Sequence, residues 1–569
     1  MPSTGVEASA ADSARAERET PPGAFARHAE RALFALLALL TLVLFAQLLE
    51  YGYGRDQAIY SLIADALLRG DAPYRDAWDF KTPGIYAVYA FARAVFGGNF
   101  AAVRVFEVLA LISLFPAFAI FSRRHVGSTR AGLLCAAVAI LAYVPIEFWY
   151  TGQPEGFGGI ALAWALACAT YSPPAGAGRA GEWRQLAAWA GAAALYSIAA
   201  LLKPPLGGGI LVSFAFVVAS RRPAASAAGW GRALAAPSLA FAVGGALPVL
   251  ATLAYFAALG ALADLSHALF VFAPGYTAID FADSSAWPLL GRSLREWLLL
   301  TAPFNLVGLV ALALLPPLAS RERLGIAHVL GVVALSLLGV ALQAKFFLYH
   351  YAAVLLLTGL LAGWGYWKLW IRARRSALTT AVFAAVLAAI AFDLAPGLPE
   401  MRVFWTRSAL RLEAHMKPEL RIPYRDGLHN FGDVDAGSNR RAAEWLIANT
   451  PSDARLFIWG FEPVIYHLSA RRPASRYIYN VPQRTEWAQA ESRQTLIQEL
   501  TAAPPAAVVV VHRDSLPWVT GSPLDSAAAL TTFPELQQLL RKEYRQARRI
   551  GDLQILLRRH SPGPGTGAR

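Results

Sequence analysis

The feature that most constrains this chain is a series of apolar runs long enough to cross a lipid bilayer. The first, residues 31–49 (RALFALLALLTLVLFAQLL), has the length of a spanning helix and lacks the small-residue cleavage site of a secretion signal. We therefore predict a polytopic α-helical membrane protein with about 11 transmembrane helices. The other ten runs are residues 101–121, 131–146, 157–171, 187–202, 206–220, 234–258, 296–318, 325–342, 347–365 and 377–395.

The composition agrees with this class. Of the 569 residues 56% are hydrophobic and 16% are charged, whereas charged residues make up about 25% of a typical soluble domain. The net charge of +13 could indicate nucleic-acid binding, but the basic residues form no stripe and no recognisable nucleic-acid module. We therefore expect membrane lipid, and no nucleic acid, among the partners. Cys135 and Cys168 lie inside apolar runs, with no Cys or His partner at metal-ligand spacing.

The distribution of basic residues predicts the topology. If the loops between the runs alternate sides, one set of five holds 14 Lys and Arg in 54 residues and the other set holds 9 in 104. Because basic loops stay in the cytoplasm, the first set is cytoplasmic. The N-terminus is then cytoplasmic, and an odd number of spans places the C-terminus outside.

The chain divides into a membrane domain and flanking segments. Residues 1–30 combine Ala, Ser, Pro and charge without apolar periodicity, which predicts a disordered cytoplasmic tail. Residues 31–396 form the predicted transmembrane domain, and its first outer loop covers residues 51–100. In this loop residues 57–69 predict an amphipathic helix on the outer surface, and residues 84–97 predict a short interfacial helix.

Residues 397–560 alternate predicted helices and strands, which indicates a soluble α/β domain with a small, largely parallel sheet. No Gly-rich phosphate loop follows these strands, so a nucleotide site has little support. Residues 561–569 are predicted to be a disordered tail. The predicted strands are residues 454–460, 475–480, 506–512 and 552–559, and the predicted helices are residues 440–450, 462–469, 492–503 and 533–547.

The first outer loop carries the most specific motif of the chain. Asp56 follows the first span, and after the amphipathic helix come GDAPY and then WDFKTPG. This order resembles the first outer loop of the GT-C glycosyltransferases, most closely the branch of protein O-mannosyltransferases, bacterial aminoarabinose transferase and RgtA/B/C/D-like enzymes. The segments WYTGQPEGFGG, QAKFFLYHYA and IWGFEPVIYHLSARRPASRY support the resemblance, which covers most of the chain.

The resemblance implies a function. Members of the family transfer a sugar from a polyprenyl-phosphate carrier to an acceptor on the outer membrane face. For this chain it implies an inner-membrane hexosyl- or pentosyltransferase, inverting at the anomeric carbon, acting on a lipid, polysaccharide or protein acceptor in cell-envelope, lipopolysaccharide or glycan biosynthesis. It implies no fixed cofactor and leaves open a divalent metal, Mg²⁺ or Mn²⁺.

The resemblance also implies roles for individual residues. Asp56 occupies the catalytic acid position and would be the base, a metal ligand or both. The family often places a second acid next to it, where this chain has Gln57. Lys81 matches the lysine of the family's K-P-P turn, here K-T-P with Thr82, and would meet the carrier phosphate. Glu155 stands where relatives place an acid in the second outer loop, and would hold the acceptor or a metal.

Three further residues are candidates for binding phosphate or sugar. Lys203, Lys345 and His350 lie at the outer ends of predicted spans. Each candidate also has a structural explanation, because acids outside helices often serve as N-caps, lysines there anchor to headgroups and histidines pack at helix ends.

Two other classes of function remain open from the sequence. A transporter or flippase for lipid-linked sugars would be expected to show related halves with broken helices, and no such internal symmetry is found. A non-catalytic scaffold would leave the charged first loop without a purpose and would tolerate replacement of Asp56.

Overall fold

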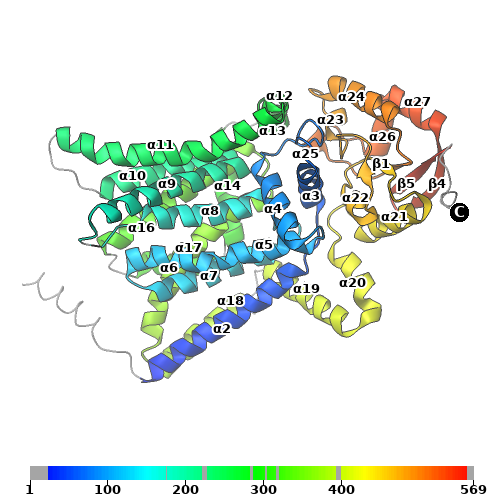
Figure 1. Cartoon of the computed structure of the whole chain (residues 1–569). Helices are drawn as coiled ribbons and strands as arrows, with labels where there is room; N and C mark the ends of the chain where they lie inside the picture. The colour runs from blue at the N-terminus through cyan, green and yellow to red at the C-terminus, as the bar shows by residue number, and fades with distance from the viewer. Residues whose placement is uncertain are drawn as a thin grey trace, which may run out of the picture.

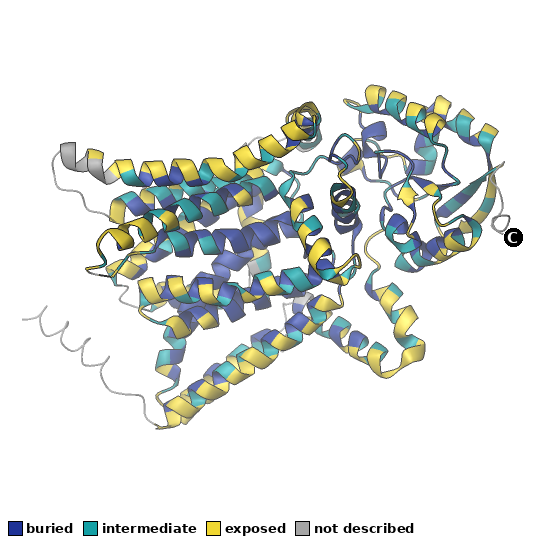
Figure 2. Cartoon of the chain, viewed as in Figure 1, coloured by how far each residue is buried: buried dark blue, intermediate teal, exposed yellow. Residues whose placement is uncertain are grey.

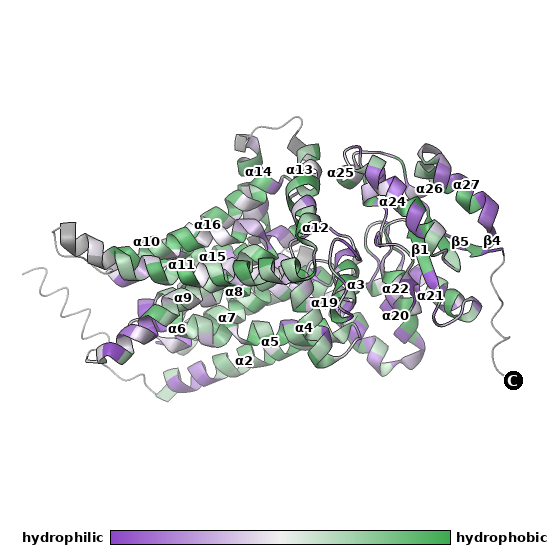
Figure 3. Ribbon diagram, turned by 45° about the horizontal axis from the view of Figure 1, so that its top comes forward, coloured by the Kyte–Doolittle hydropathy of each residue, from purple (hydrophilic) through white to green (hydrophobic). Residues whose placement is uncertain are grey.

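The computed structural model describes residues 24–174, 176–220, 227–281, 286–301, 304–315, 319–392 and 399–559. A bundle of long helices is joined at one end to a smaller domain that contains a sheet (Figure 1). Apolar residues run along the bundle, and hydrophilic residues gather at its ends and in the smaller domain (Figure 3). The predicted tail at residues 561–569 lies outside the described residues.

The helices of the bundle and its loops are α2 (Ala24–Leu49), α3 (Arg55–Leu68), α4 (Gly84–Phe96), α5 (Ala101–Ile112), α6 (Leu114–Val126), α7 (Thr129–Tyr143), η1 (Val144–Ile146), α8 (Pro154–Ala169), α9 (Gly178–Leu202), η2 (Pro204–Gly208), α10 (Gly209–Ser220), α11 (Ala227–Ala258), α12 (Leu262–His267), η3 (Ala268–Phe272), α13 (Ala273–Phe281), α14 (Ala286–Thr301), α15 (Phe304–Leu314), α16 (Ser320–Gln343), η4 (Leu348–Tyr351), α17 (Ala352–Ala373) and α18 (Ala377–Ala391).

Membrane-spanning helices dominate this part of the chain, which confirms the predicted polytopic class. Among the described residues, seven helices are long and apolar enough to cross a membrane. The predicted spans at residues 157–171, 206–220 and 377–395 are shorter apolar helices, so the count of about 11 stays a prediction. The seven are Ala24–Leu49, Ala101–Val126, Thr129–Ile146, Gly178–Leu202, Leu234–Ala258, Ser320–Gln343 and Leu348–Ala373.

The predicted span over residues 296–318 corresponds to two bent segments, so this span stays a prediction. The helical segments Trp287–Leu300 and Asn305–Leu314 are bent by 99° relative to each other. Residues 302 and 303, between the two segments, lie outside the described residues. The apolar pattern continues across these positions, so composition alone could not reveal the bend.

Helix α17 forms the centre of the bundle, and 94% of its most apolar window is buried. In Figure 2 it lies among buried residues, while α2 and α11 are exposed on the outside. Two glycines bring it close to α7: a side chain at Gly359 would collide with Ala139, and one at Gly363 with Cys135. Such small residues allow close helix approach in membranes, where packing contributes much of the helix association energy.

Helix α2 begins at Ala24, so the predicted tail at residues 1–30 is too long. Residues 24–30 are helical, and residues 1–23 lie outside the described part. The buried Glu30 carboxylate explains why the helix starts early, because Arg130 and Arg374 each reach it at 2.6 Å. These ion pairs attach the first turns of α2 to the ends of two other helices.

The smaller domain contains a mixed five-stranded sheet in the order β2-β1-β3-β5-β4. Strand β1 is parallel to β2 and β3, whereas β5 is antiparallel to β3 and β4, so the predicted parallel arrangement holds for half of the sheet. The elements are α19 (Pro399–Met416), η5 (Pro418–Leu420), α20 (Arg421–Leu428), α21 (Ala436–Asn449), β1 (Arg455–Trp459), α22 (Val464–Ser469), β2 (Arg472–Pro473), α23 (Val481–Arg484), α24 (Gln489–Ala502), β3 (Ala507–Val511), α25 (Pro517–Thr520), α26 (Ser526–Ala529), η6 (Leu530–Thr532), α27 (Pro534–Glu543), β4 (Tyr544–Ile550) and β5 (Leu553–Arg558).

Two predictions for this domain are wrong. The predicted helix at residues 533–547 ends at Glu543, and the chain continues as β4, because Gly551 makes a turn that pairs β4 with β5. Residues 475–480 form no strand of the sheet. Their alternating tyrosines face the first loop, where Tyr477 makes a β-bridge with Trp78.

Helix α3 does not lie on the outer surface as predicted. It packs between α4 and α22, and residues around its whole circumference are buried, including Ile59, Tyr60, Ile63 and Ala64. The apolar residues of α3, whose spacing predicted one membrane-facing stripe, therefore pack against other parts of the protein. Figure 1 shows α3 at the junction of the bundle and the smaller domain.

Candidate active site

Asp56 lies in the first turn of α3, where the helix N-terminus favours a negative charge. Its carboxylate is 3.5 Å from the side-chain amide of Gln153 and faces the hydroxyl of Tyr349. The Tyr60 hydroxyl donates to Gln153 at 3.1 Å and orients the amide. A partly exposed acid is thus held in place by neutral polar groups.

Two cationic side chains lie near the acid and its phenol neighbour: Lys81 lies near Tyr349, and Lys203 lies near Asp56. The Lys81 ammonium is 5.9 Å from the ring centroid of Tyr349, and it forms no ion pair with any described residue. Lys203, between α9 and η2, lies close enough to Lys81 and Asp56 to interact with both electrostatically. The residues Asp56, Lys81 and Lys203 are therefore brought together, although they are far apart in the sequence.

Glu155 is the partner of Lys203. It lies in the first turn of α8 and is buried, with its Oε1 3.0 Å from the Lys203 ammonium and 3.8 Å from Nε2 of His350. Burial lowers the pKa of Lys203, and the negative charge of Glu155 opposes that decrease. The structure thus places Glu155 next to a cation of the site, not next to Asp56.

Lys345 lies at the edge of this group. Its ammonium donates a hydrogen bond to the carbonyl of Trp518 in α25, at 2.8 Å, and lies 4.1 Å from the ring centroid of Tyr276. This lysine connects the loop before α17 to the smaller domain.

Gln57 positions the second outer loop, a role that was missed from the sequence. Its side-chain amide donates to the carbonyls of Phe148, Trp149 and Thr151 at 3.1, 3.0 and 2.9 Å. Its carbonyl oxygen accepts from the backbone of Gly54 at 3.0 Å. A carboxylate could not donate these bonds, which explains why no second acid follows Asp56 here.

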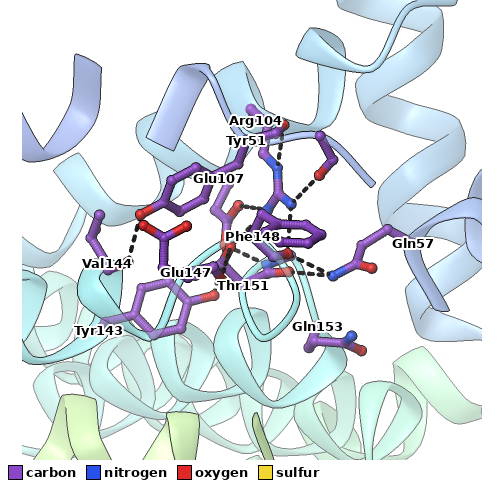
Figure 4. A network of polar contacts seen from close by, with 12 residues as sticks. Tyr51, Gln57, Arg104, Glu107, Tyr143, Val144, Glu147, Phe148, Thr151 and Gln153 are labelled. Carbon is purple, nitrogen blue, oxygen red and sulfur yellow. Dashed lines mark hydrogen bonds and ion pairs between the residues drawn. The ribbon is translucent and has the colours of Figure 1, made fainter. Parts of the chain in front are cut away.

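A buried ion pair supports the same two loops (Figure 4). Arg104 and Glu107 are 2.8 Å apart on α5 and both are fully buried. Arg104 also donates to the carbonyls of Gly52 and Phe148, and Glu107 accepts from the backbone of Gly152 at 2.6 Å. Two charges in an otherwise apolar helix are a signal that sequence reasoning could have used.

The smaller domain contacts the first outer loop next to Asp56. Arg55, which precedes Asp56, forms ion pairs with Asp433 at 2.8 Å and Glu462 at 2.7 Å. Asp79 accepts hydrogen bonds from Tyr86 at 2.8 Å and from Tyr479 of the smaller domain at 2.7 Å. The site is therefore built by both domains.

A divalent metal at Asp56, which the sequence left open, would need protein ligands around this carboxylate. In the described residues no group of three or more His, Cys, Asp or Glu side chains converges. The neighbours of Asp56 are an amide and a phenol, so these residues do not fit a site made of protein ligands alone.

The comparison with known proteins finds similar structures. No family model and no curated protein matches the sequence. The crystal structure of ArnT from Cupriavidus metallidurans bound to undecaprenyl phosphate aligns with 92% of this chain and 98% of its own, at a TM-score of 0.55 and 14% identity. The apo structure of ArnT gives the same TM-score, over 97% of its own length.

A second protein is less similar. The Archaeoglobus fulgidus oligosaccharyltransferase aligns with 87% of this chain and 72% of its own, at a TM-score of 0.46 and 13% identity. The similarity to ArnT establishes the fold. The chain has the GT-C fold, and it shares this fold with ArnT over nearly its whole length.

Proposed function

We propose that this chain is an integral-membrane glycosyltransferase that transfers a sugar from a polyprenyl-phosphate carrier to a hydroxyl of a lipid, polysaccharide or protein acceptor. The observation that carries the proposal is the meeting of one acid, Asp56, with the cations Lys81 and Lys203 near Tyr349. Sugar transfer from a phosphate needs this combination, because a proton leaves the acceptor while negative charge develops on the phosphate. The fold shared with ArnT, a protein seen bound to undecaprenyl phosphate, supports the choice of carrier.

The proposed reaction is a single displacement. The acceptor oxygen forms a bond to the anomeric carbon, and the bond from that carbon to the phosphate oxygen breaks. The electron pair of the broken bond stays on the phosphate, where Lys81 and Lys203 stabilise it. Asp56 accepts the hydroxyl proton. The new bond forms opposite the leaving group, so the anomeric configuration inverts.

Glu155 and His350 support this arrangement without meeting the reacting atoms. Burial lowers the pKa of Lys203, and Glu155 favours its charged form, because the carboxylate offsets part of the cost of removing the ammonium from water. His350 lies beside the same carboxylate. Lys345 holds the loop before α17 against α25.

We also propose that the site faces the outside of the cell membrane. Hydrophilic residues gather at the end of the bundle away from the smaller domain (Figure 3), and the basic residues Arg130 and Arg374 pair with Glu30 of α2. Because basic loops remain in the cytoplasm, this end would be cytoplasmic and the smaller domain extracytoplasmic. Cysteine-accessibility labelling at the exposed positions Ala490 and Ala377 in intact cells would test this orientation.

The test of function is sugar transfer in membranes from cells that express the wild type, Asp56→Asn or Asp552→Asn. The membranes are supplied with a panel of radiolabelled polyprenyl-phosphate sugars and with native lipid, glycan and protein acceptors. Asp552 is the matched control, because it is a partly exposed acid that pairs with the surface residue Arg513, away from Asp56. A parallel reaction with a chelator tests for a divalent metal.

We expect the wild type and Asp552→Asn to transfer label to an acceptor, and Asp56→Asn to be slower by about 10²-fold to 10⁴-fold. Equal transfer by all three proteins would remove Asp56 from the mechanism. If no donor supports transfer by correctly inserted wild type, a transporter or scaffold becomes the better explanation.

A further inference from the structure

A second cavity lies between the first loop and the smaller domain. Its volume is about 1100 Å³, and its walls come from α3, α4, α22 and the strands β1 and β2. None of the candidate residues Asp56, Lys81, Glu155, Lys203, Lys345 and His350 lines it. It is therefore distinct from the site described above, although both border α3.

The charges of this cavity are unbalanced. Seven arginines and four acids line it. All four acids are already paired: Asp65 with Arg93, Asp71 with Arg69, Asp76 with Arg75 and Glu499 with Arg476. Of the remaining arginines, Arg471 donates to backbone carbonyls and to Thr450. The two remaining arginines of the cavity, Arg455 and Arg472, have no acidic partner among the described residues.

Arg455 and Arg472 stand side by side at the start of two parallel strands. They are register partners in the pairing of β1 with β2, and both are exposed. Neither guanidinium has an ion pair or hydrogen bond within the described ranges. Like charges in register on adjacent strands repel, and an anion between them would remove that repulsion. Two guanidinium groups also match the geometry of a phosphoryl group, which each can bind with two hydrogen bonds.

We propose that Arg455 and Arg472 bind a phosphoryl group of the acceptor. This assignment of the acceptor rests on the proposed transfer reaction, whereas the binding of a phosphoryl group does not. Asp56 lies at one end of α3, and Asp65 and Arg69, which line the cavity, lie toward the other. Nine residues of helix separate Asp56 from Asp65, or about 13 Å. The acceptor would therefore be larger than a single sugar and would carry its phosphate away from the reacting hydroxyl.

The test is protection of individual arginines from phenylglyoxal, read by mass spectrometry on the full-length protein. The protein is placed in phosphatidylcholine nanodiscs with or without inorganic phosphate, and in nanodiscs that also contain phosphatidylglycerol. Arg545 and Arg548 are internal controls, because they are exposed on β4 of the same domain and lie outside the cavity. This readout separates Arg455 and Arg472 from the lysines of the candidate active site, which phosphate could also reach.

We expect modification of Arg455 and Arg472 to fall by about tenfold with an anion at about ten times its Kd, while Arg545 and Arg548 react as before. Protection by inorganic phosphate in phosphatidylcholine assigns a soluble phosphoryl group, and protection by phosphatidylglycerol alone assigns a lipid headgroup. No protection in either condition, or equal protection of the controls, would overturn the proposal.

A kinetic measurement links the cavity to transfer. We expect Arg455→Gln/Arg472→Gln to raise KM for a phosphorylated acceptor by about tenfold or more with kcat unchanged, and Arg545→Gln/Arg548→Gln to change neither. If arginine protection is found but no transfer occurs with any donor, the phosphoryl site stands and the proposed function fails.

Discussion

The Lys203 ammonium lies 3.0 Å from the Glu155 carboxylate, and both side chains are largely removed from water. We propose that neither residue acts as the catalytic base. Their pairing instead places a positive charge where burial alone would disfavour it, close to Asp56 and Lys81. The protonation of Lys203 should therefore limit activity at high pH.

Glu155→Gln should move the alkaline limb of kcat/KM to lower pH. Burial lowers the pKa of Lys203 and Glu155 opposes this, so removing the carboxylate lets that pKa fall further. The Lys203 ammonium then loses its proton at a lower pH. At that pH the donor phosphate loses its cationic partner. The pH profile of transfer measures this, with the exposed Glu491→Gln as control. An alkaline limb unchanged in Glu155→Gln would contradict the role given to this pair.

Lys81→Gln and Lys345→Gln should differ in their effects. The Lys81 ammonium has no ion pair in the part of the chain that the structure describes, and is available to a phosphate. We expect its loss to lower kcat/KM by about 10²-fold. Lys345 is bonded to the Trp518 carbonyl, so its replacement should cost less than about tenfold. Steady-state kinetics on both variants decide this, and a larger loss with Lys345→Gln would reverse the assignment.

Gln57→Glu should destabilise the protein although it restores the acid that relatives often carry. The new carboxylate would face the carbonyls of Phe148, Trp149 and Thr151, and could not donate to them. We expect the free energy of unfolding to fall by about 2–4 kcal/mol. Thermal unfolding in detergent measures this, compared with the exposed Gln538→Glu. A Tm equal to that of the wild type would mean that the loop contacts of Gln57 contribute little.

Acidification should loosen the contact between the smaller domain and the first loop. Nε2 of His429 accepts from the backbone N–H of Gly52 at 2.8 Å, and its Nδ1–H donates to the Arg425 carbonyl. Burial lowers the pKa of His429 to about 4, from about 6.5 in the unfolded chain. Between these values the unfolded state alone binds the proton, so stability is complete above pH of about 6.5 and falls as the pH decreases toward 4, by about 1–3 kcal/mol.

The measurement is Tm between neutral and mildly acidic pH for the wild type and for His429→Gln. Other groups also titrate in this range, and the difference between the two proteins isolates the histidine. Parallel pH dependences in both would show that His429 contributes nothing to the acid sensitivity.

The sequence was sufficient to predict the membrane class, and the roles of the charged residues that it singled out stay predictions. Asp56, Lys81, Glu155 and Lys203 stand out because a charge next to an apolar run is costly, and alternating loops place all four at the same end of the bundle. Their pairing could not be predicted in the same way. The contact between Glu155 and Lys203 depends on how α8 packs against α9. The hydropathy of the two helices does not contain this information.

The supporting contacts were hidden for a different reason. The pattern of residues 57–69 fits a helix with one apolar face, and nothing local to it indicates that α22 covers the other face. Gln57 looks like a neutral replacement for an acid until its three carbonyl partners are known. Arg104 and Glu107, by contrast, were visible as an i,i+3 charge pair in an apolar helix.

The ion pairs of Arg55 with Asp433 and Glu462 have a consequence for how such proteins can be recombined. A chimera boundary placed after the last membrane helix would separate Arg55, the neighbour of Asp56, from its partners Asp433 and Glu462. Exchanging smaller domains between related chains should therefore succeed only when the first loop is exchanged with them. In this chain we expect activity to require the first outer loop and the smaller domain together, and neither part to be sufficient alone.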